Sequence, residues 1–174
     1  MSQKPGQDDL YHEVSESFRD ALARLVRAYE LDPEKQSDLQ QEIHLALWRS
    51  FASYESRCSL RTWVYRVAHN TAASYVLGQK RAKRDVLIGM EELEAVADLG
   101  GVGRVDEERF ALERLFELIH RLKQPDRQLM LLYLEDLDAG SIGEITGLSA
   151  GNVRIKIHRI KKILARRFHQ RGTE

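Results

Sequence analysis

The chain has 174 residues, of which 43% are hydrophobic and 31% are charged, and its formal net charge is zero. This composition is typical of one or two small globular domains. The single cysteine, Cys58, excludes an internal disulfide, and no apolar run approaches the ~18 residues of a membrane span. With no signal-peptide pattern at its start, the sequence predicts a cytoplasmic protein without membrane insertion.

The zero net charge hides a strong alternation of charge along the chain. Residues 57–84 contain seven basic and no acidic residues, and residues 151–174 contain eight basic residues and one acidic residue. The two remaining segments are acidic, with eleven acidic and six basic residues in 1–56 and fifteen and six in 85–150. Two separated basic segments predict two nucleic-acid contact surfaces.

The first 53 residues have the apolar spacing of two helices. After a frayed terminus at 1–9, apolar residues recur at helical spacing from Leu10 to Leu31, which predicts one amphipathic helix ended by Asp32 and Pro33. A second helix is expected from Pro33 or Glu34 to Ser53. Its inner stripe is Leu39, Ile43, Ala46, Leu47 and Phe51.

Asp38 and Glu42 lie one turn apart on the outer face of the second expected helix and form an acidic spot. From spacing alone, a merely solvated face is the favoured explanation of this acidic spot. A polar loop follows from Tyr54 to Ser59, and in it Cys58 lacks the neighbouring ligands that a metal site needs.

The third expected helix, Ser59 to about Arg84, interleaves aromatic and basic residues and ends in a basic cluster. Aromatic faces stack on single-stranded bases while cations hold the phosphates, so its exposed side fits an opened strand. Tyr65 falls off the apolar stripe and is the better stacking candidate, whereas Trp63 is expected in the core.

Residues 85–106 contain scattered acids and several glycines with weak periodicity, which predicts a linker. Two helices should follow, one from Glu107 to Leu122 and one capped by Asp126. A short helix at 139–146, a turn at Gly147 and a capping Ser149 then predict a helix-turn-helix.

The last helix, Ser149 to Phe168, has an apolar stripe on one side and a basic face on the other. Val153, Ile157, Ile160 and Leu164 form the stripe, which implies burial. The opposite face is rich in hydrogen-bond donors and suits the major groove of DNA. An ordinary helical hairpin with a solvated basic face is the alternative reading.

The chain contains no recognisable catalytic constellation. Its six histidines form no metal pattern, and it has neither a glycine-rich phosphate loop nor an isolated carboxylate pair. We therefore expect a binding protein without a metal or other cofactor, and not an enzyme.

Three stretches together resemble the extracytoplasmic-function sigma factors of bacterial RNA polymerase. They are D-L-Q-Q-E-I-H-L-A-L-W-R-S-F from Asp38, S-L-R-T-W-V-Y-R-V-A-H-N-T-A-A-S-Y from Ser59, and Q-P-D-R-Q-L-M-L-L-Y-L-E-D-L from Gln124 with the terminal helix-turn-helix. The likeness spans nearly the whole chain, and R-T-W-V-Y-R-V-A-H-N is its most specific part.

The resemblance implies an all-α fold of two small helical domains joined by a flexible linker. Residues 1–84 would form the region 2-like domain, which docks on core polymerase and reads and melts the minus-ten promoter element. Residues 85–106 would be the linker, which in the family occupies the RNA-exit path. Residues 107–174 would form the region 4-like domain that reads the minus-thirty-five element.

The same likeness implies three sets of site residues, and the Tyr54–Ser59 loop would help to hold an unstacked base. The minus-ten set is Arg61, Tyr65, Arg66, His69, Asn70, Lys80 and Arg81. The minus-thirty-five set is Ser149, Asn152, Arg154, Ile155, Lys156, His158, Arg159 and Lys162. The polymerase-binding set is Asp38, Gln41 and Glu42.

The expected partners are core RNA polymerase, through its beta-prime coiled coil and beta flap, and promoter DNA. Many members of the family are also held inactive by an anti-sigma factor. The rival reading is a stand-alone helix-turn-helix regulator, which would leave the segment Arg61–Tyr75 as scaffolding.

Two departures from the family pattern affect these expectations. Lys35, Gln36 and Ser37 stand where the family carries more acids, which weakens the electrostatic part of polymerase docking. Ile155 replaces a small polar residue, which predicts an apolar contact with DNA and a distinct promoter preference.

Overall fold

The structure is a computed structural model that describes residues 6–86 and 104–170, with side chains for 6–79 and 109–168. Over these residues the chain forms eight α-helices and no β-strand, as the resemblance predicts. They are α1 (Gln7–Ser17), α2 (Arg19–Tyr29), α3 (Pro33–Phe51), α4 (Leu60–Val86), α5 (Arg104–His120), α6 (Gln124–Leu134), α7 (Ala139–Thr146) and α8 (Ala150–Gln170).

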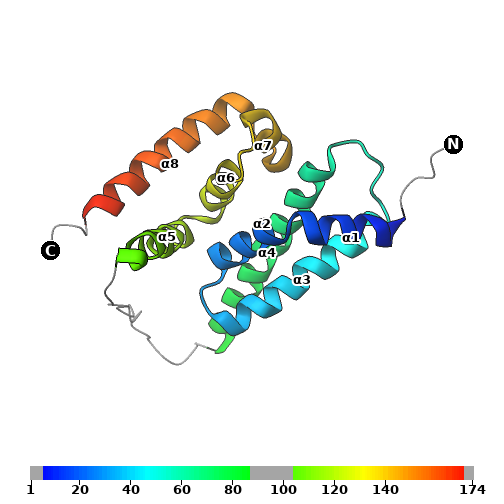
Figure 1. The fold of residues 1–174 in the computed structure, drawn as a ribbon, viewed down its shortest axis with the longest axis horizontal. Helices are drawn as coiled ribbons and strands as arrows, with labels where there is room; N and C mark the ends of the chain where they lie inside the picture. The colour runs from blue at the N-terminus through cyan, green and yellow to red at the C-terminus, as the bar shows by residue number, and fades with distance from the viewer. Residues whose placement is uncertain (1–5, 87–103, 171–174) are drawn as a thin grey trace.

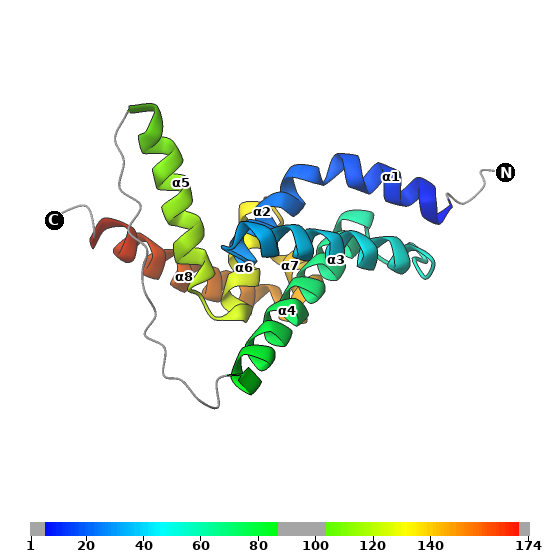
Figure 2. The same cartoon turned by 90° about the horizontal axis from the view of Figure 1, so that it is seen from below.

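The helices form two groups that lie side by side, α1 to α4 and α5 to α8 (Figure 1). Helices α6 and α7 lie against α4, and α5 lies against α2. A view from below shows α4 running under α3, with α5 standing apart from α1 (Figure 2). The buried apolar side chains of both groups make one connected core.

In the first group, α3 and α4 pack along their apolar stripes. Leu39, Ile43, Leu47 and Phe51 recur every fourth residue on α3, and all four are buried as predicted. Each such side chain stabilises the fold by about 1.5–3 kcal/mol through burial. Asp32 begins α3 by accepting a hydrogen bond from the Glu34 backbone N–H, as the Asp-Pro sequence indicates.

The expected single helix from Leu10 to Leu31 is wrong, because the chain breaks it at Phe18. Phe18 has φ −108° and ψ 8°, outside the α-helical range, and its ring packs edge-on against Tyr65 at 5.8 Å between centroids. The break lets α1 turn onto α3, where Trp48 Nε1 donates a 2.8 Å hydrogen bond to Asp8.

Several element boundaries differ slightly from the predictions. Helix α4 continues to Val86, and α5 already begins at Arg104. Asp126 does not cap α6 but lies in its first turn, after an N-cap at Lys123. Most of the expected linker, 85–106, lies outside the described residues.

The helix-turn-helix forms as predicted from α7 and α8. The Asp138 carboxylate caps α7 by accepting from the Gly140 and Ser141 backbone N–H groups at 2.7 and 3.1 Å. Gly147 ends α7 in the left-handed region with φ 76°, a conformation that favours glycine. Ser149 Oγ accepts from the Asn152 N–H at 3.3 Å at the start of α8.

The close approach of α7 to the turn depends on Gly143. A Cβ at this position would lie 2.5 Å from the Leu148 carbonyl oxygen, which is backbone and cannot rotate away. We expect Gly143→Ala to lower the free energy of unfolding by about 1–3 kcal/mol, as overpacked cores do. Urea unfolding followed by circular dichroism measures it.

Gly78→Ala is the matched control, since nothing lies within 4 Å of its added Cβ on α4. The control should gain about 0.8–1 kcal/mol from the better helix propensity of alanine. Equal effects of the two substitutions would show that the turn does not need glycine.

Candidate nucleic-acid interfaces

Helix α8 presents its predicted basic face to solvent. The stripe of Val153, Ile157, Ile160 and Leu164 is buried against α5, α6 and α7, and it fixes the rotation of the helix about its axis. The opposite side chains therefore point outward. Seven predicted residues of this face are exposed, and Lys156 is half-buried. The exposed residues are Ser149, Asn152, Arg154, Ile155, His158, Arg159 and Lys162.

Two side chains of this face are well placed for a groove. Ile155 is 70% exposed, which is unusual for so large an apolar residue and leaves it open to a partner. Arg159 lies 3.7 Å from the Asp126 carboxylate but keeps 61% of its side-chain surface exposed. This long, exposed ion pair holds Arg159 only weakly.

A hollow of about 340 Å³ flanks the basic face between α6, α7 and α8. Its floor is apolar, from Leu137, Ile142 and Ile157, and its rim carries Arg154 and His158. The exposed basic face of α8 therefore has a recess beside it.

On the other group of helices, Asn70 of α4 is exposed beside a second hollow of about 340 Å³. Glu42 of α3 and Thr71, Ser74 and Tyr75 of α4 line it with Asn70. Hydroxyl and amide groups in such a recess can hydrogen-bond the edge of an unstacked base.

The predicted polymerase-binding residues Asp38, Gln41 and Glu42 are all exposed on one side of α3. Leu45 and Trp48, exposed by 42% and 40%, continue this side of the helix toward its C-terminus. The face is acidic at one end and apolar at the other, which suits a protein partner.

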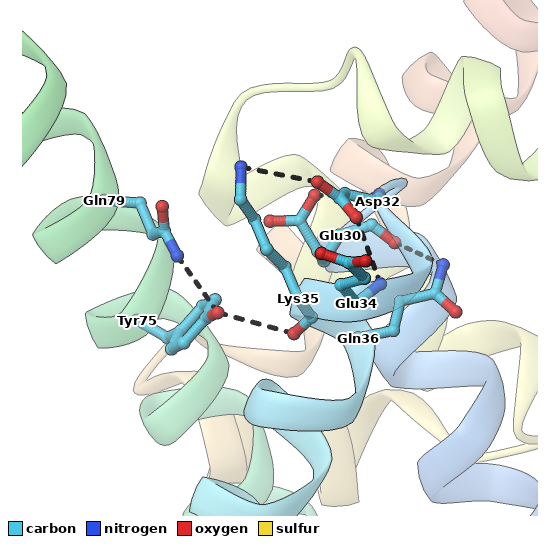
Figure 3. A network of polar contacts seen from close by, with 7 residues as sticks. All are labelled: Glu30, Asp32, Glu34, Lys35, Gln36, Tyr75 and Gln79. Carbon is cyan, nitrogen blue, oxygen red and sulfur yellow. Dashed lines mark hydrogen bonds and ion pairs between the residues drawn. The ribbon is translucent and has the colours of Figure 1, made fainter.

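Helix α3 is anchored to α4 at its N-terminal end (Figure 3). The Tyr75 hydroxyl donates to the Lys35 carbonyl oxygen at 3.4 Å and accepts from the Gln79 amide at 3.0 Å. The Lys35 ammonium lies 3.6 Å from the Asp32 carboxylate. The lysine that departs from the family pattern therefore offsets one of the acids at this end of α3.

Two residues predicted to face DNA, Tyr65 and His69, are in fact buried, at 3% and 1% exposure. The Tyr65 hydroxyl donates to the Glu135 carboxylate at 3.2 Å, and burial, aided by Glu135, raises its pKa to about 12. His69 Nδ1 lies 3.1 Å from the Tyr29 hydroxyl, and burial lowers the pKa of the imidazole to about 3. The expectation that Tyr65 is an exposed stacking platform is wrong.

The predicted minus-ten arginines lie on the surface but point toward the second group of helices. Arg61 donates to the Glu135 carbonyl oxygen, and Arg66 donates to the Glu144 carbonyl oxygen at 2.8 Å. Lys80 and Arg81 lie on α4, but their side chains are outside the described residues.

The loop 54–59 is held by its own aromatic residue. Tyr54 is buried against Trp63, with 5.3 Å between ring centroids, and its hydroxyl donates to the Cys58 carbonyl oxygen at 2.9 Å. Ser56 takes a positive φ of 58° at the tip. These contacts give the loop a defined conformation next to the start of α4.

Sequence reasoning missed Glu135, which ends α6 and binds three residues of the first group. Its carboxylate accepts from Arg24 Nε at 2.6 Å and Nη2 at 2.8 Å, and it also accepts from Tyr65. The charge pattern could have indicated this contact. An acidic pair, Glu135 and Asp136, follows the apolar run of α6, whereas the only charged residues near the start of α4 are basic.

Among the described residues, no three histidine, cysteine or acidic side chains are grouped to hold a metal ion. None of the helices that the structure describes is long and apolar enough to cross a membrane.

The fold and these surfaces define a helical protein with a helix-turn-helix reader in its second half and a separate polar and basic helix in its first. Family models match both halves: Sigma-70 region 2 matches residues 14–82, and Sigma-70 region 4 matches residues 112–164.

Two relatives match most of the chain. The ECF RNA polymerase sigma-E factor of Haemophilus influenzae is 31% identical over 73% of this chain and 71% of its own length. The ECF RNA polymerase sigma factor SigW of Bacillus subtilis is 24% identical over 95% of this chain and 92% of its own. The chain therefore belongs to the extracytoplasmic-function sigma factors, which direct transcription initiation by RNA polymerase.

Two solved structures share the fold at 16% identity. CnrH, solved in complex with the cytosolic domain of CnrY, has a TM-score of 0.63 over 89% of this chain and 84% of its own. RpoE of Bartonella quintana, solved with the anti-sigma factor NepR, has a TM-score of 0.63 over 87% of this chain and 94% of its own.

The burial of His69 generates a testable pH dependence. An imidazole whose pKa falls from about 6.5 when unfolded to about 3 when folded takes up its proton only in the unfolded state between these values. The contribution of His69 to the free energy of unfolding is therefore largest above pH 6.5 and decreases as the pH falls below that value. The stability advantage of wild type over His69→Gln should shrink by about 1.4 kcal/mol between pH 7.5 and 5.5.

Urea unfolding of both proteins at the two pH values measures this difference. A stability gap that stays constant would mean that His69 accepts a proton in the folded protein, which contradicts its burial.

Proposed function

We propose that this sigma factor divides its work between its two halves as follows. Residues 1–84 dock on core polymerase through Asp38, Gln41 and Glu42 and hold the opened minus-ten strand along α4. Residues 107–174 read the minus-thirty-five duplex with the outer face of α8. The observation that carries the proposal is the exposed basic face of α8, held outward by a fully formed helix-turn-helix.

The chemistry of each surface supports its assigned role. A convex basic helix enters the major groove, where Arg154 and Arg159 can donate to guanine and Ile155 can contact a thymine methyl group. A recess lined by Asn70, Thr71, Ser74 and Tyr75 of α4 and by Glu42 of α3 offers hydrogen-bonding groups to a base that has left the stack of a single strand.

We further propose that the beta-prime coiled coil receives the acidic and apolar face of α3, and that the beta flap contacts the region 4-like domain. Core polymerase would place the chain in the cytoplasm. A stand-alone regulator is the weaker reading, since it gives the exposed face of Asp38, Gln41 and Glu42 no partner.

An anti-sigma factor is a further candidate partner. The solved neighbours CnrH and RpoE were captured with CnrY and with the anti-sigma factor NepR. Leu77 on α4 and Leu112 on α5 are exposed by 54% and 48%, and they offer apolar contacts for such a protein.

The direct test is transcription in vitro with sigma-free bacterial core polymerase and fragments of the source genome. The proposal expects discrete transcripts that depend on this protein. It also expects the double variant Asp38→Ala, Glu42→Ala to bind core polymerase more weakly, because two exposed acids on one face are lost. The absence of any protein-dependent transcript would overturn the proposal.

The reading role of α8 gives a sharper prediction. Arg159→Ala should weaken promoter recognition by about 1–3 kcal/mol, mainly at one base pair upstream, if its guanidinium donates to that base. Transcription from a library of promoters with single substitutions measures the preference at each position.

Arg121→Ala, which removes the same charge from the exposed connection between α5 and α6, is the control and should leave the preference unchanged. If Arg159→Ala lowered transcription uniformly across the library, Arg159 would be a phosphate contact and not a base reader.

A further inference from the structure

Arg159, for which we propose base reading in the upstream duplex, has an acidic neighbour on another helix. Its Nη2 atom lies 3.7 Å from Oδ2 of Asp126, a residue in the first turn of α6. The Arg159 side chain is 61% exposed and the Asp126 side chain is 23% exposed. The sequence predicts only a capping role for Asp126, whereas the structure places its carboxylate beside the exposed basic face of α8.

The position of Asp126 is fixed by the residue that follows it. Arg127 is buried, and its guanidinium donates to the carbonyl oxygens of His120, at the end of α5, and of Leu122, in the connection to α6. The same guanidinium stacks over the Tyr29 ring, 5.2 Å from its centroid. These contacts hold the first turn of α6 in place, so the Asp126 carboxylate is presented at a defined position.

The backbone of Arg159 is fixed as well. Ile157 and Ile160, on either side of it in the sequence, are buried, and α8 packs against α6. The helix therefore cannot rotate to carry Arg159 toward α6 or away from it. The freedom that remains in the pair is mainly that of the long arginine side chain, which has several rotatable bonds.

Arg159 lies well along the recognition helix. It follows Ala150, the first residue of α8, by about 13 Å of helix axis. Recognition helices contact base edges mainly with their N-terminal residues, so an arginine at this depth can reach either a base edge or a phosphate. A phosphate contact carries no direct sequence information. What restrains the Arg159 side chain therefore decides whether it contributes specificity.

We propose that Asp126 is a positioning residue for promoter reading, whose carboxylate holds the Arg159 guanidinium toward a base edge and away from the phosphates. This inference rests on the proposed function of α8. A guanidinium carries five N–H donors in a fixed fork, so a carboxylate beside Nη2 leaves other donors for a guanine. The negative charge of Asp126 also repels phosphates, which disfavours the backbone contact.

The ion pair is weak in the free protein and becomes stronger on DNA. With both side chains in contact with water, a pair 3.7 Å apart contributes little to the stability of the fold. A helix in the groove removes water from Arg159, which lowers the local dielectric constant and strengthens the attraction at the same distance. The effect of Asp126 therefore belongs to the complex with the promoter.

The test uses Asp126→Asn, which keeps the shape of the side chain and removes its charge, in transcription by core polymerase from the library of singly substituted promoters. The measured quantity is the ratio of transcription with the preferred base pair to transcription with the other three at the position that Arg159 reads. This ratio should fall about three- to fivefold, the range of an exposed ion pair. Asp126→Glu keeps the charge and should retain the ratio.

Two controls separate positioning from other roles of the carboxylate. Glu117→Gln removes the same charge from an exposed site on α5 and should leave the ratio unchanged. In an Arg159→Ala background, Asp126→Asn should have no further effect on the ratio, as for two partners in one contact. A weaker first turn of α6, which loses a favourable acid, would lower transcription equally from every promoter and would not change the ratio.

An unchanged ratio for Asp126→Asn, or an equal loss at every promoter, would overturn the positioning role. The proposed function would stand as long as Arg159→Ala still shows its preference at one position. A change in the ratio that persists in the Arg159→Ala background would also overturn it, because Asp126 would then act without Arg159. Absence of any protein-dependent transcript would instead remove the proposed function.

Discussion

Basic side chains on the surface of α4 need an anionic or dipolar partner, and in this structure the chain itself supplies one. Arg24 and Tyr65 donate to the Glu135 carboxylate, and Arg61 donates to the carbonyl oxygen of the same residue. These three donors are thereby satisfied within the protein. These contacts help to fix the relative position of the two helical groups.

The second group of helices is organised differently, because apolar burial fixes the outer face of α8, for which we propose duplex reading. Val153, Ile157 and Ile160 lock the rotation of α8, and Gly143 lets α7 approach the turn closely. The face is therefore formed before any DNA arrives, which lowers the entropic cost of binding.

Strong periodicity made much of the fold predictable. The stripes of α3 and α8, the Asp32 cap and the Gly147 turn all follow from local residue chemistry. The break at Phe18 was missed because no proline or glycine marks it; the ring leaves the helix to pack on Tyr65. The burial of Tyr65 and His69 was missed because helical spacing describes one buried side, whereas α4 is covered from two. Glu135 lies far from its partners along the chain, so the local charge pattern marks an acidic residue there but does not identify the residues that it binds.

The account rests on two surfaces of one chain meeting two different stretches of promoter DNA. The most direct test of this claim is photo-crosslinking in the complex with core polymerase and a promoter. A photo-crosslinking amino acid replaces Asn70 in one variant and Ile155 in another. The account predicts that the Asn70 probe marks only the non-template strand of the minus-ten element, and that the Ile155 probe marks the upstream duplex. Crosslinks from both probes to the same stretch, or none from Asn70, would contradict it.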